Sequence, residues 1–263
     1  MPSAARPAHR YVFVAGLHRT GTSLLAKIIG THPHVSAIRG APVPENEGCY
    51  LQGAIPHTAL DGIPGHFATD PRQHYTEEHA LNTFETKLRL DQEWGEWFDH
   101  SAPWRLEKSP VNLTRMRLLQ ALFPLSNFIV VTRHPQFMAQ ALQKWTDQDV
   151  ATVAEYGVEA YRLMLDDLQY LHRAIVIRYE DLVKRPGDYL EAIAAFLDLE
   201  PSFTPFDIRD GNLDYEVAGH GPGKIDALGY RSDGSTDPVA SIIRHPLRAI
   251  RDKTWSAITS RPS

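Results

Sequence analysis

The chain has 263 residues, 43% hydrophobic and 22% charged, the composition of one ordinary globular domain with a sizeable core. These values exclude disordered, collagen-like and coiled-coil proteins. The 27 Lys and Arg against 32 Asp and Glu give a formal net charge of -5, so no overall positive field favours nucleic acid or an anionic membrane. A single cysteine, Cys49, permits neither an internal disulfide nor a Cys-based zinc pattern, which favours a reducing compartment.

The N-terminal region carries no long apolar segment. The apolar run from Tyr11 to Leu17 is interrupted by Gly16 and is too short for a signal-peptide core or a membrane span. We therefore expect a cytoplasmic protein with no membrane and no nucleic-acid partner. A homodimer is the default expectation for the oligomeric state, because twofold dimers are the commonest oligomers of soluble proteins.

Short runs rich in β-forming residues alternate with helical stretches, a pattern typical of an α/β protein with a mostly parallel sheet. The run 11–15 is almost continuously apolar, as expected of a strand buried on both faces. The turn from Gly16 to Gly21 leads from it into a helix over 22–30. Further strands are expected at 35–38, 104–107, 128–132 and 174–179, and helices at 76–98, 112–123, 151–173, 187–197 and 241–253, with one more ending at Trp145.

The segment 40–72 breaks this alternation. It is rich in proline and glycine and has little periodicity, which predicts a long irregular segment of the kind that is often functional. The tail 207–263 is expected to form a C-terminal loop followed by the terminal helix. The whole chain, 1–263, is expected to be a single domain.

Polar residues follow the predicted strands where each strand ends. His18, Arg19 and Thr20 follow the first strand, while Lys108, Arg133 and Tyr179 close three later ones. Because ligands bind outside the carboxyl ends of the strands in open parallel sheets, these side chains are expected to meet at one site.

The turn Gly16-Leu-His-Arg-Thr-Gly-Thr-Ser23 has the spacing of a phosphate-binding P-loop, with Thr22 where that motif has lysine. Glycines and a helix N-terminus still offer backbone N–H groups to an anion. The lysine that bridges the phosphates of a nucleoside triphosphate is missing, and Arg19 supplies positive charge within the loop instead. The loop therefore favours a terminal phosphate carrying a small transferable anionic group.

Four segments together resemble the sulfotransferase family over about 11–199. They are VAGLHRTGTSLL at 14–25, LEKSP at 106–110, FIVVTRHP at 128–135 and IRYEDLVKRP at 177–186; the loop and lysine segments are most similar to tyrosylprotein sulfotransferases. The resemblance implies a P-loop-like three-layer α/β fold with a central, mostly parallel sheet flanked by helices. It also implies transfer of a sulfonate group from 3′-phosphoadenosine 5′-phosphosulfate (PAPS) to a hydroxyl or amine of a small-molecule acceptor, with 3′-phosphoadenosine 5′-phosphate (PAP) as product and no metal.

The resemblance assigns a role to each motif residue. Arg19 is expected to neutralise the charge that develops on the departing 5′-phosphate, and Lys108 to lie against the sulfonate. Arg133 is expected to bind the 3′-phosphate and Tyr179 to edge the adenine. The donor-binding set is completed by His18, by Thr20, Gly21, Thr22 and Ser23 for the 5′-phosphate, and by Lys224 as a candidate phosphate contact.

Two positions depart from the family pattern. Ala141 stands where many relatives have a serine that binds the 3′-phosphate, and Gln140, Lys144 or Lys224 are candidates to replace it. Pro110 stands where cytosolic relatives have the histidine that takes the proton.

The general base must therefore come from elsewhere. Glu47 and Glu45 are the candidates, with Glu47 favoured because its apolar neighbours predict burial and a raised pKa. His18 and His57 are rival bases. Residues 40–104 are expected to form the acceptor site and lid, with Tyr50, Phe67, Trp94, Trp97 and Trp104 as walls.

Two alternatives remain open at the level of sequence. A P-loop-like small-molecule kinase would use Glu180 and Asp181, which follow a strand, to bind magnesium. A non-catalytic nucleotide-binding module would keep the fold without the chemistry. The 13 histidines show no paired spacing of metal ligands, so no metal site is expected.

Overall fold

The computed structural model describes residues 9–57, 66–204, 208–217 and 221–259. Its centre is a six-stranded sheet with the order β2-β3-β1-β4-β5-β6. All neighbours are parallel except β6, which runs antiparallel to β5. The strands are β1 (Arg10–Gly16), β2 (Val35–Ala37), β3 (Trp104–Lys108), β4 (Asn127–Thr132), β5 (Ala174–Arg178) and β6 (Ile243–Arg244), so the shortest strands, β2 and β6, lie at the two edges.

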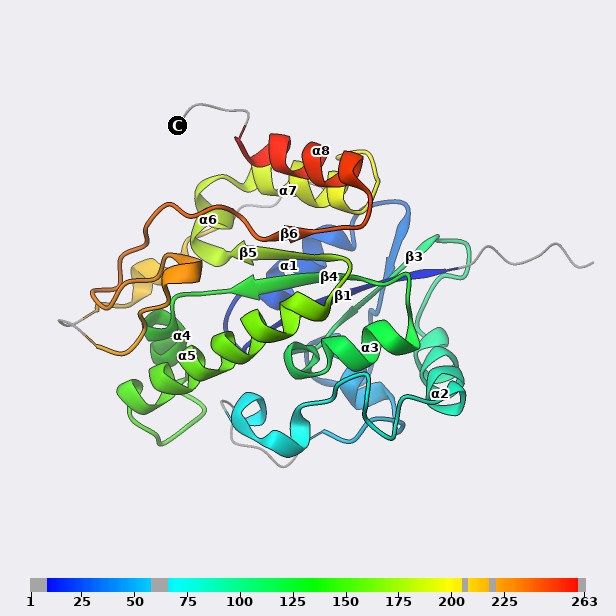
Figure 1. The fold of residues 1–263 in the computed structure, drawn as a ribbon, viewed down its shortest axis with the longest axis horizontal. Helices are drawn as coiled ribbons and strands as arrows, with labels where there is room; N and C mark the ends of the chain where they lie inside the picture. Colours follow the sequence, from blue (N-terminus) through cyan, green and yellow to red (C-terminus); the bar gives the residue numbers. More distant parts are fainter. Residues whose placement is uncertain (1–8, 58–65, 205–207, 218–220, 260–263) are drawn as a thin grey trace, which may run out of the picture.

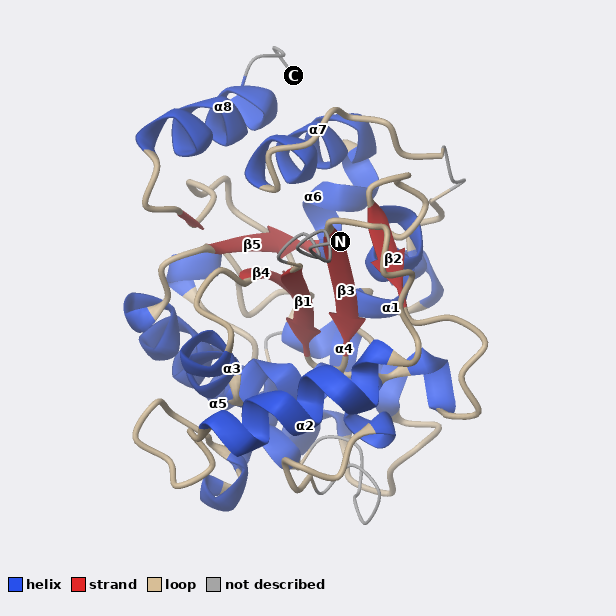
Figure 2. Ribbon diagram, turned by 90° about the vertical axis from the view of Figure 1, so that its right-hand side faces the viewer, coloured by secondary structure: helices blue, strands red, loops and turns tan. Residues whose placement is uncertain are grey.

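Helices cover both faces of the sheet (Figures 1 and 2). One face carries α1 (Thr22–Ile29), α6 (Tyr179–Lys184), α7 (Pro186–Phe196) and α8 (Arg248–Thr259). The other carries α2 (Phe84–Gly95), α3 (Met116–Leu122), α4 (Pro135–Leu142) and α5 (Val150–Asp167). The predicted three-layer α/β architecture is confirmed.

The central strand β1 shows why the molecule has two cores. Its residues alternate between the faces, with Tyr11 and Phe13 in the core beneath α2 to α5 and Val12 and Val14 in the core beneath α1, α7 and α8. All four are buried, which accounts for the continuous apolar run in the sequence.

Several predicted helices differ from the observed ones. The helix expected at 76–98 begins only at Phe84, because Thr83 caps it by accepting a hydrogen bond from the N–H of Thr86. The helix expected at 151–173 ends at Asp167, and Tyr179, expected to end the strand β5, opens the short helix α6 instead.

The helix expected at 112–123 is interrupted. Residues Pro110–Thr114 form a 3₁₀ turn, and α3 begins at Met116. The backbone of Tyr75 enters the gap, where its N–H donates to the Thr114 carbonyl (2.8 Å) and its carbonyl accepts from the N–H of Leu118 (3.3 Å).

The terminal helix is also displaced from its expected position at 241–253. Ile243 and Arg244 pair with β5 as β6, and α8 begins at Arg248, after Pro246. Proline inside a helix removes a hydrogen bond and clashes with the preceding turn, so the helix starts beyond it. Within the described ranges, no helix is both long enough and apolar enough to cross a membrane.

Candidate active site

The strand ends of the parallel sheet open into a cavity of about 660 Å³. Its wall comes from the loop after β1, the 3₁₀ turns near residue 47, the loop after β3, the loop after β4, the start of α6 and the segment after residue 210. The lining residues are His18, Arg19, Gly21, Thr22, Ser23, Leu24, Pro44, Glu45, Glu47, Tyr50, Pro110, Arg133, Trp145, Tyr179, Gly211, Asp214 and Tyr215. The expected convergence of His18, Arg19, Arg133 and Tyr179 is therefore observed.

The loop between β1 and α1 has a backbone that requires glycine at one position. Gly21 has a φ of 99°, and a Cβ atom there would lie 2.9 Å from the ring of Tyr179. Arg19 also has a left-handed backbone, with a φ of 65°. The first helical bond runs from the N–H of Leu25 to the carbonyl of Gly21, which leaves the earlier N–H groups of α1 for an anion.

Three hydroxyl residues of this loop have different positions. Thr22 and Ser23 line the cavity. Thr20 is fully buried, and its hydroxyl donates to the carbonyl of Leu17 at 2.8 Å. The Thr20 side chain therefore closes the loop, and its hydroxyl donor is used within the loop, which leaves the Thr20 backbone for the expected role at a phosphate.

Lys108 and Glu47 form a buried ion pair beside the cavity. The Lys108 Nζ donates to Glu47 Oε1 at 2.9 Å, and the two side chains are 5% and 9% exposed. Burial raises the pKa of the Glu47 carboxyl, although the ammonium of Lys108 opposes the shift. Glu45 is exposed, with a φ of 51°. Of the two glutamates, Glu47 has the buried, raised-pKa environment that the sequence predicts for a base.

A second buried carboxylate, Glu107, holds this arrangement in place. It accepts hydrogen bonds from the Gly48 N–H (3.0 Å), the Ser109 hydroxyl (2.5 Å) and the Asn112 amide (2.5 Å). Burial raises the pKa of Glu107. Its three donors tie the end of β3 to the turn that follows Glu47.

His18 and Arg19 form part of an aromatic corner. The ring of His18 lies edge to face with Phe67 at 5.6 Å and with Trp145 at 6.5 Å, and Arg19 stacks over Trp145 at 5.1 Å. Burial, together with the charge of Lys108, lowers the pKa of His18 to about 4. The imidazole is therefore neutral at neutral pH, and its buried Nδ1 has no hydrogen-bond partner among the described residues.

Arg133 also lines the cavity, next to the loop that carries Arg19. Its Nε donates to Asn212 Oδ1 at 2.7 Å and its Nη1 to the Arg19 carbonyl at 2.9 Å. The guanidinium lies 4.9 Å from the Tyr179 ring centre and 5.6 Å from that of Tyr215. Its Nη2 is buried without a partner in the described part of the chain. The N–H groups of Nη2 are thus not used by the described residues and can donate to an anionic ligand.

Hydrogen bonds from neighbouring segments fix the surroundings of Arg133. The Tyr179 hydroxyl accepts from the Gly211 N–H at 2.7 Å and donates to the Arg209 carbonyl at 3.2 Å. The Glu180 carboxylate accepts from the His134 N–H at 2.8 Å and from the Asn212 amide at 3.3 Å. Burial raises the pKa of Glu180.

The acidic pair that the kinase alternative needs is already used within the fold. Glu180 is buried and bonded to its neighbours, and Asp181 forms an ion pair with Arg178 at 2.6 Å. Neither lines the cavity. Over the described ranges, no three His, Cys, Asp or Glu residues are grouped so that they could hold a metal ion.

Other expected site residues lie elsewhere. Lys224 is exposed, pairs with Asp226 at 3.3 Å and is outside the cavity lining, so its expected phosphate contact is not supported. Ala141 is buried in α4. The segment 211–215, rather than Gln140, Lys144 or Lys224, completes the wall beside Arg133.

Of the aromatic residues expected to line the acceptor site, some lie at or beside the cavity and others lie in the cores. Tyr50 lines the cavity, and Phe67 is buried against His18. Trp94 and Trp104 are buried in the two cores instead, so their expectation as acceptor walls is wrong; the indole N–H of Trp94 donates to the Gly48 carbonyl at 2.8 Å. Trp97 is partly buried and packs against the core that contains Trp94. His57 contacts the ring of Tyr50 but does not line the cavity.

Sequence reasoning missed three residues of the site. Trp145 contacts Arg19, Asn212 holds Arg133, and Tyr215 packs against the Arg133 guanidinium. Trp145 ends a predicted helix, and the DGNLDY segment carries turn residues, but neither has a spacing that indicates a ligand contact.

Residues 11–205 match a family model described as the sulfotransferase family. No curated protein matches the sequence significantly. Among solved structures, a sulfotransferase from Mycobacterium avium is 16% identical, with 74% of this chain and 65% of that chain covered and a TM-score of 0.51. A sulfotransferase domain from the curacin biosynthetic pathway is 20% identical (76% of each chain covered, TM-score 0.45), and one from the Synechococcus PCC 7002 olefin synthase is 16% identical (100% and 99% covered, TM-score 0.48).

Proposed function

The chain belongs to the sulfotransferase family and catalyses sulfonate transfer, and we propose that PAPS is its donor and that a small molecule with a hydroxyl or amine is its acceptor. The observation that carries the choice of donor is Arg133, whose buried Nη2 has no partner in the described chain. The 3′-phosphate distinguishes PAPS from ordinary adenine nucleotides, and a guanidinium N–H forms a strong, charge-assisted hydrogen bond to a phosphate oxygen.

The remaining parts of the donor have matching surfaces. The loop from Arg19 to Ser23, with the N-terminus of α1, offers backbone N–H groups and hydroxyls to the 5′-phosphate. Tyr179 and Tyr215 offer ring faces next to Arg133 for the adenine and its ribose. A kinase is disfavoured because Glu180 and Asp181 are engaged within the fold.

PAPS supplies a sulfonate whose bond to the 5′-phosphate oxygen breaks as the acceptor oxygen bonds to sulfur. Arg19 and Lys108 place positive charge where negative charge develops on the bridging and sulfonate oxygens, which is the main task of the protein in transfers of this kind. Glu47 takes the proton from the acceptor, since a carboxylate bonded to Lys108 through one oxygen keeps a second oxygen free to accept.

Calorimetric titration with PAP, adenosine 5′-phosphate and Mg-ATP tests the donor. We expect PAP to bind at least about tenfold more tightly than adenosine 5′-phosphate, equivalent to about 1.4 kcal/mol for the added 3′-phosphate. In Arg133→Gln the two affinities are expected to become nearly equal. Arg248→Gln, which changes an exposed arginine on α8, is the matched control.

Two results would contradict this proposal. Equal binding of PAP and adenosine 5′-phosphate by the unaltered protein would remove the role of Arg133. Tight binding of Mg-ATP without binding of PAP would support the kinase alternative instead.

A further inference from the structure

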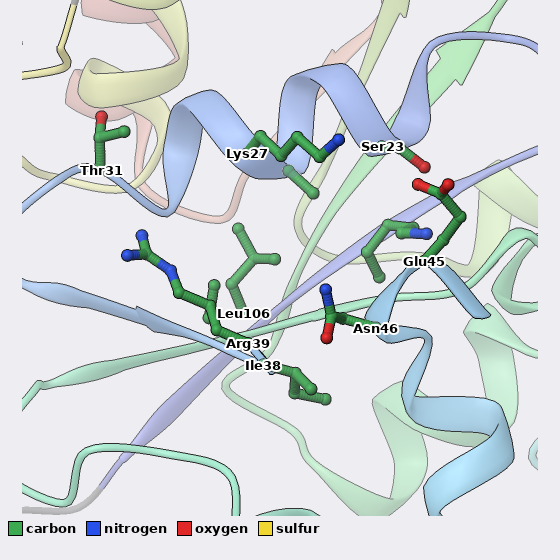
Figure 3. A pocket seen from close by; sticks show the side chains of 11 residues that line it. Ser23, Lys27, Thr31, Ile38, Arg39, Glu45, Asn46 and Leu106 are labelled. Carbon is green, nitrogen blue, oxygen red and sulfur yellow. The ribbon is translucent and has the colours of Figure 1, made fainter. Parts of the chain in front are cut away.

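A second cavity, of about 300 Å³, lies along α1 beside the edge strand β2. Figure 3 shows α1 on one side, with Ser23 and Lys27, and the segment after β2 on the other, with Ile38 and Arg39. Ala26, Ala37, Ile38 and Leu106 give this cavity an apolar middle. An apolar cavity with a few placed polar groups is the usual form of a small-molecule site.

This cavity adjoins the proposed donor pocket at one end. Ser23 and Glu45 line both cavities. Lys108 lines the second cavity and bonds at 2.9 Å to Glu47, which lines the first. A molecule in the second cavity therefore has one end beside the groups assigned to sulfonate transfer.

The other end of the cavity is cationic. In Figure 3 the guanidinium of Arg39 lies toward Thr31, away from Ser23 and Glu45. The Nη2 of Arg39 donates to the Gly30 carbonyl, and this bond fixes the Arg39 side chain along the wall. The other N–H groups of the guanidinium stay available to a ligand. Thr31 is not an available ligand group, because its hydroxyl donates to Ile28 (2.7 Å) and accepts from Thr204 (2.9 Å).

The charges of the cavity favour an anion. Lys27, Arg39 and Lys108 line it against one carboxylate, Glu45. Lys108 is paired with Glu47, whereas neither Lys27 nor Arg39 forms an ion pair with any residue that the structure describes. Two uncompensated cations beside an apolar wall would repel a cationic acceptor and attract an anionic one.

We propose that this cavity binds the acceptor, and that the acceptor is an elongated hydroxy acid whose carboxylate or similar anionic group binds Arg39. The inference rests on the proposed function of the neighbouring pocket. The acceptor hydroxyl lies at the Ser23 and Lys108 end, an apolar chain crosses Ile38 and Leu106, and the anionic group lies at the Arg39 end.

The test compares ω-hydroxyalkanoates of graded chain length with their methyl esters, titrated into the PAP-saturated protein. At the best length we expect the acid to bind at least about tenfold more tightly than its ester. Arg39→Gln is expected to weaken the acid about tenfold, to leave the ester unchanged and to leave PAP affinity unchanged. Lys27→Gln is expected to produce a smaller loss for the acid, and Arg248→Gln none.

The outcomes separate this inference from the function on which it rests. The inference fails if the acid and its ester bind equally at every chain length, or if Arg39→Gln weakens the binding of both equally. Sulfonation of any of the hydroxy esters would still support the proposed transferase activity. If Arg39→Gln weakens PAP, the cavity belongs to the donor site and the inference also fails. If the unaltered protein does not bind PAP, the proposed function fails, and the acid and ester comparison in the free protein still decides the charge preference of the cavity.

Discussion

Arg19 and Lys108, the two cations that we propose act in sulfonate transfer, come from different elements and differ in burial. Arg19 comes from an exposed, left-handed position of the first loop, and Lys108 is buried at the end of β3. Both positions could be predicted from the sequence, because Lys108 ends a buried parallel strand and Arg19 lies just after another. The Thr20 hydroxyl could not, because which hydroxyl of a tight loop points inward depends on the backbone turn and not on residue type.

Removal of either charge is expected to affect turnover more than folding. Arg19→Ala and Lys108→Ala should each lower kcat by about 10²- to 10³-fold, since preorganised charge at a transition state contributes this much. Sulfonation of the best acceptor measures the loss. Because Lys108→Ala leaves a buried carboxylate without its partner, urea unfolding must be measured beside it. Near-normal rates in both variants would refute these roles.

The proposed role of Glu47 as general base predicts a pH dependence for the reaction. A base must be ionised to accept a proton, and burial raises the pKa of Glu47 above its ordinary value of 4.5. On the acid side of the pH profile, kcat/KM is therefore expected to rise with pH as Glu47 ionises. The midpoint of this rise should lie at a higher pH than the pKa of an exposed glutamate. Glu47→Gln should lower the rate and abolish this limb. A limb near pH 4 that survives in Glu47→Gln would identify His18, whose pKa is lowered to about 4, as the base.

His18 also links stability to pH. Its pKa falls from an ordinary 6.5 to about 4 on folding. Between these values the unfolded chain binds a proton that the folded protein does not, so stability is present above pH 6.5 and is lost as pH falls toward 4. The loss amounts to at most about 3 kcal/mol.

Urea unfolding of the unaltered protein and of His18→Gln, at about pH 7 and about pH 4, measures this contribution. The difference in unfolding free energy between the two pH values should be smaller in the variant. Equal pH dependence in the two proteins would show that His18 does not titrate in this way.

At the scale of elements, strands were predicted more accurately than helices. Strands β1, β4 and β5 are short apolar runs, and all five observed parallel strands lie within a residue of their expected bounds. The helices expected at 22–30 and 187–197 match α1 and α7 within a residue, whereas those expected at 76–98 and 112–123 are too long, because Thr83 caps α2 and the Tyr75 backbone separates Pro110–Thr114 from α3. Such interruptions come from tertiary contacts, which apolar spacing does not encode. The part of the cavity wall formed by residues 211–215 was missed for the same reason. Its position depends on hydrogen bonds from Asn212 to Glu180 and from Gly211 to Tyr179.

The conformation of the loop between β1 and α1 depends on Gly21. Gly21→Ala places a Cβ in a left-handed backbone, 2.9 Å from the Tyr179 ring. We expect a loss of about 1–3 kcal/mol in unfolding free energy and weaker binding of PAP. Gly187→Ala is the control, because nothing lies within 4 Å of its added Cβ and helix α7 gains from alanine. Equal stability of the two variants would contradict the strain at Gly21.

At the scale of the molecule, the C-terminal helix completes the second core. Ile258 of α8 is 4% exposed and belongs to the core that contains Val12 and Val14. The sequence predicts a terminal helix but not its start, because β6 and Pro246 occupy the residues before it.

Loss of this packing should destabilise the protein without affecting donor binding. Ile258→Ala is expected to lower the unfolding free energy by about 2–5 kcal/mol, the range for large-to-alanine changes in a core. Leu247→Ala, at a position 59% exposed, is the control and should change it little. Urea unfolding measures both, and PAP affinity of the folded variants should equal that of the unaltered protein. A change in Ile258→Ala no larger than in Leu247→Ala would contradict the role of α8.

The two edge strands limit how copies of this molecule can associate. β2 has three residues and β6 has two, so each border of the sheet offers only a few backbone N–H and C=O groups to another chain. Long, flat edges invite intermolecular β-pairing and aggregation, whereas very short ones oppose it. The sheet therefore ends within the molecule, and a dimer formed by continuing it across two copies is disfavoured.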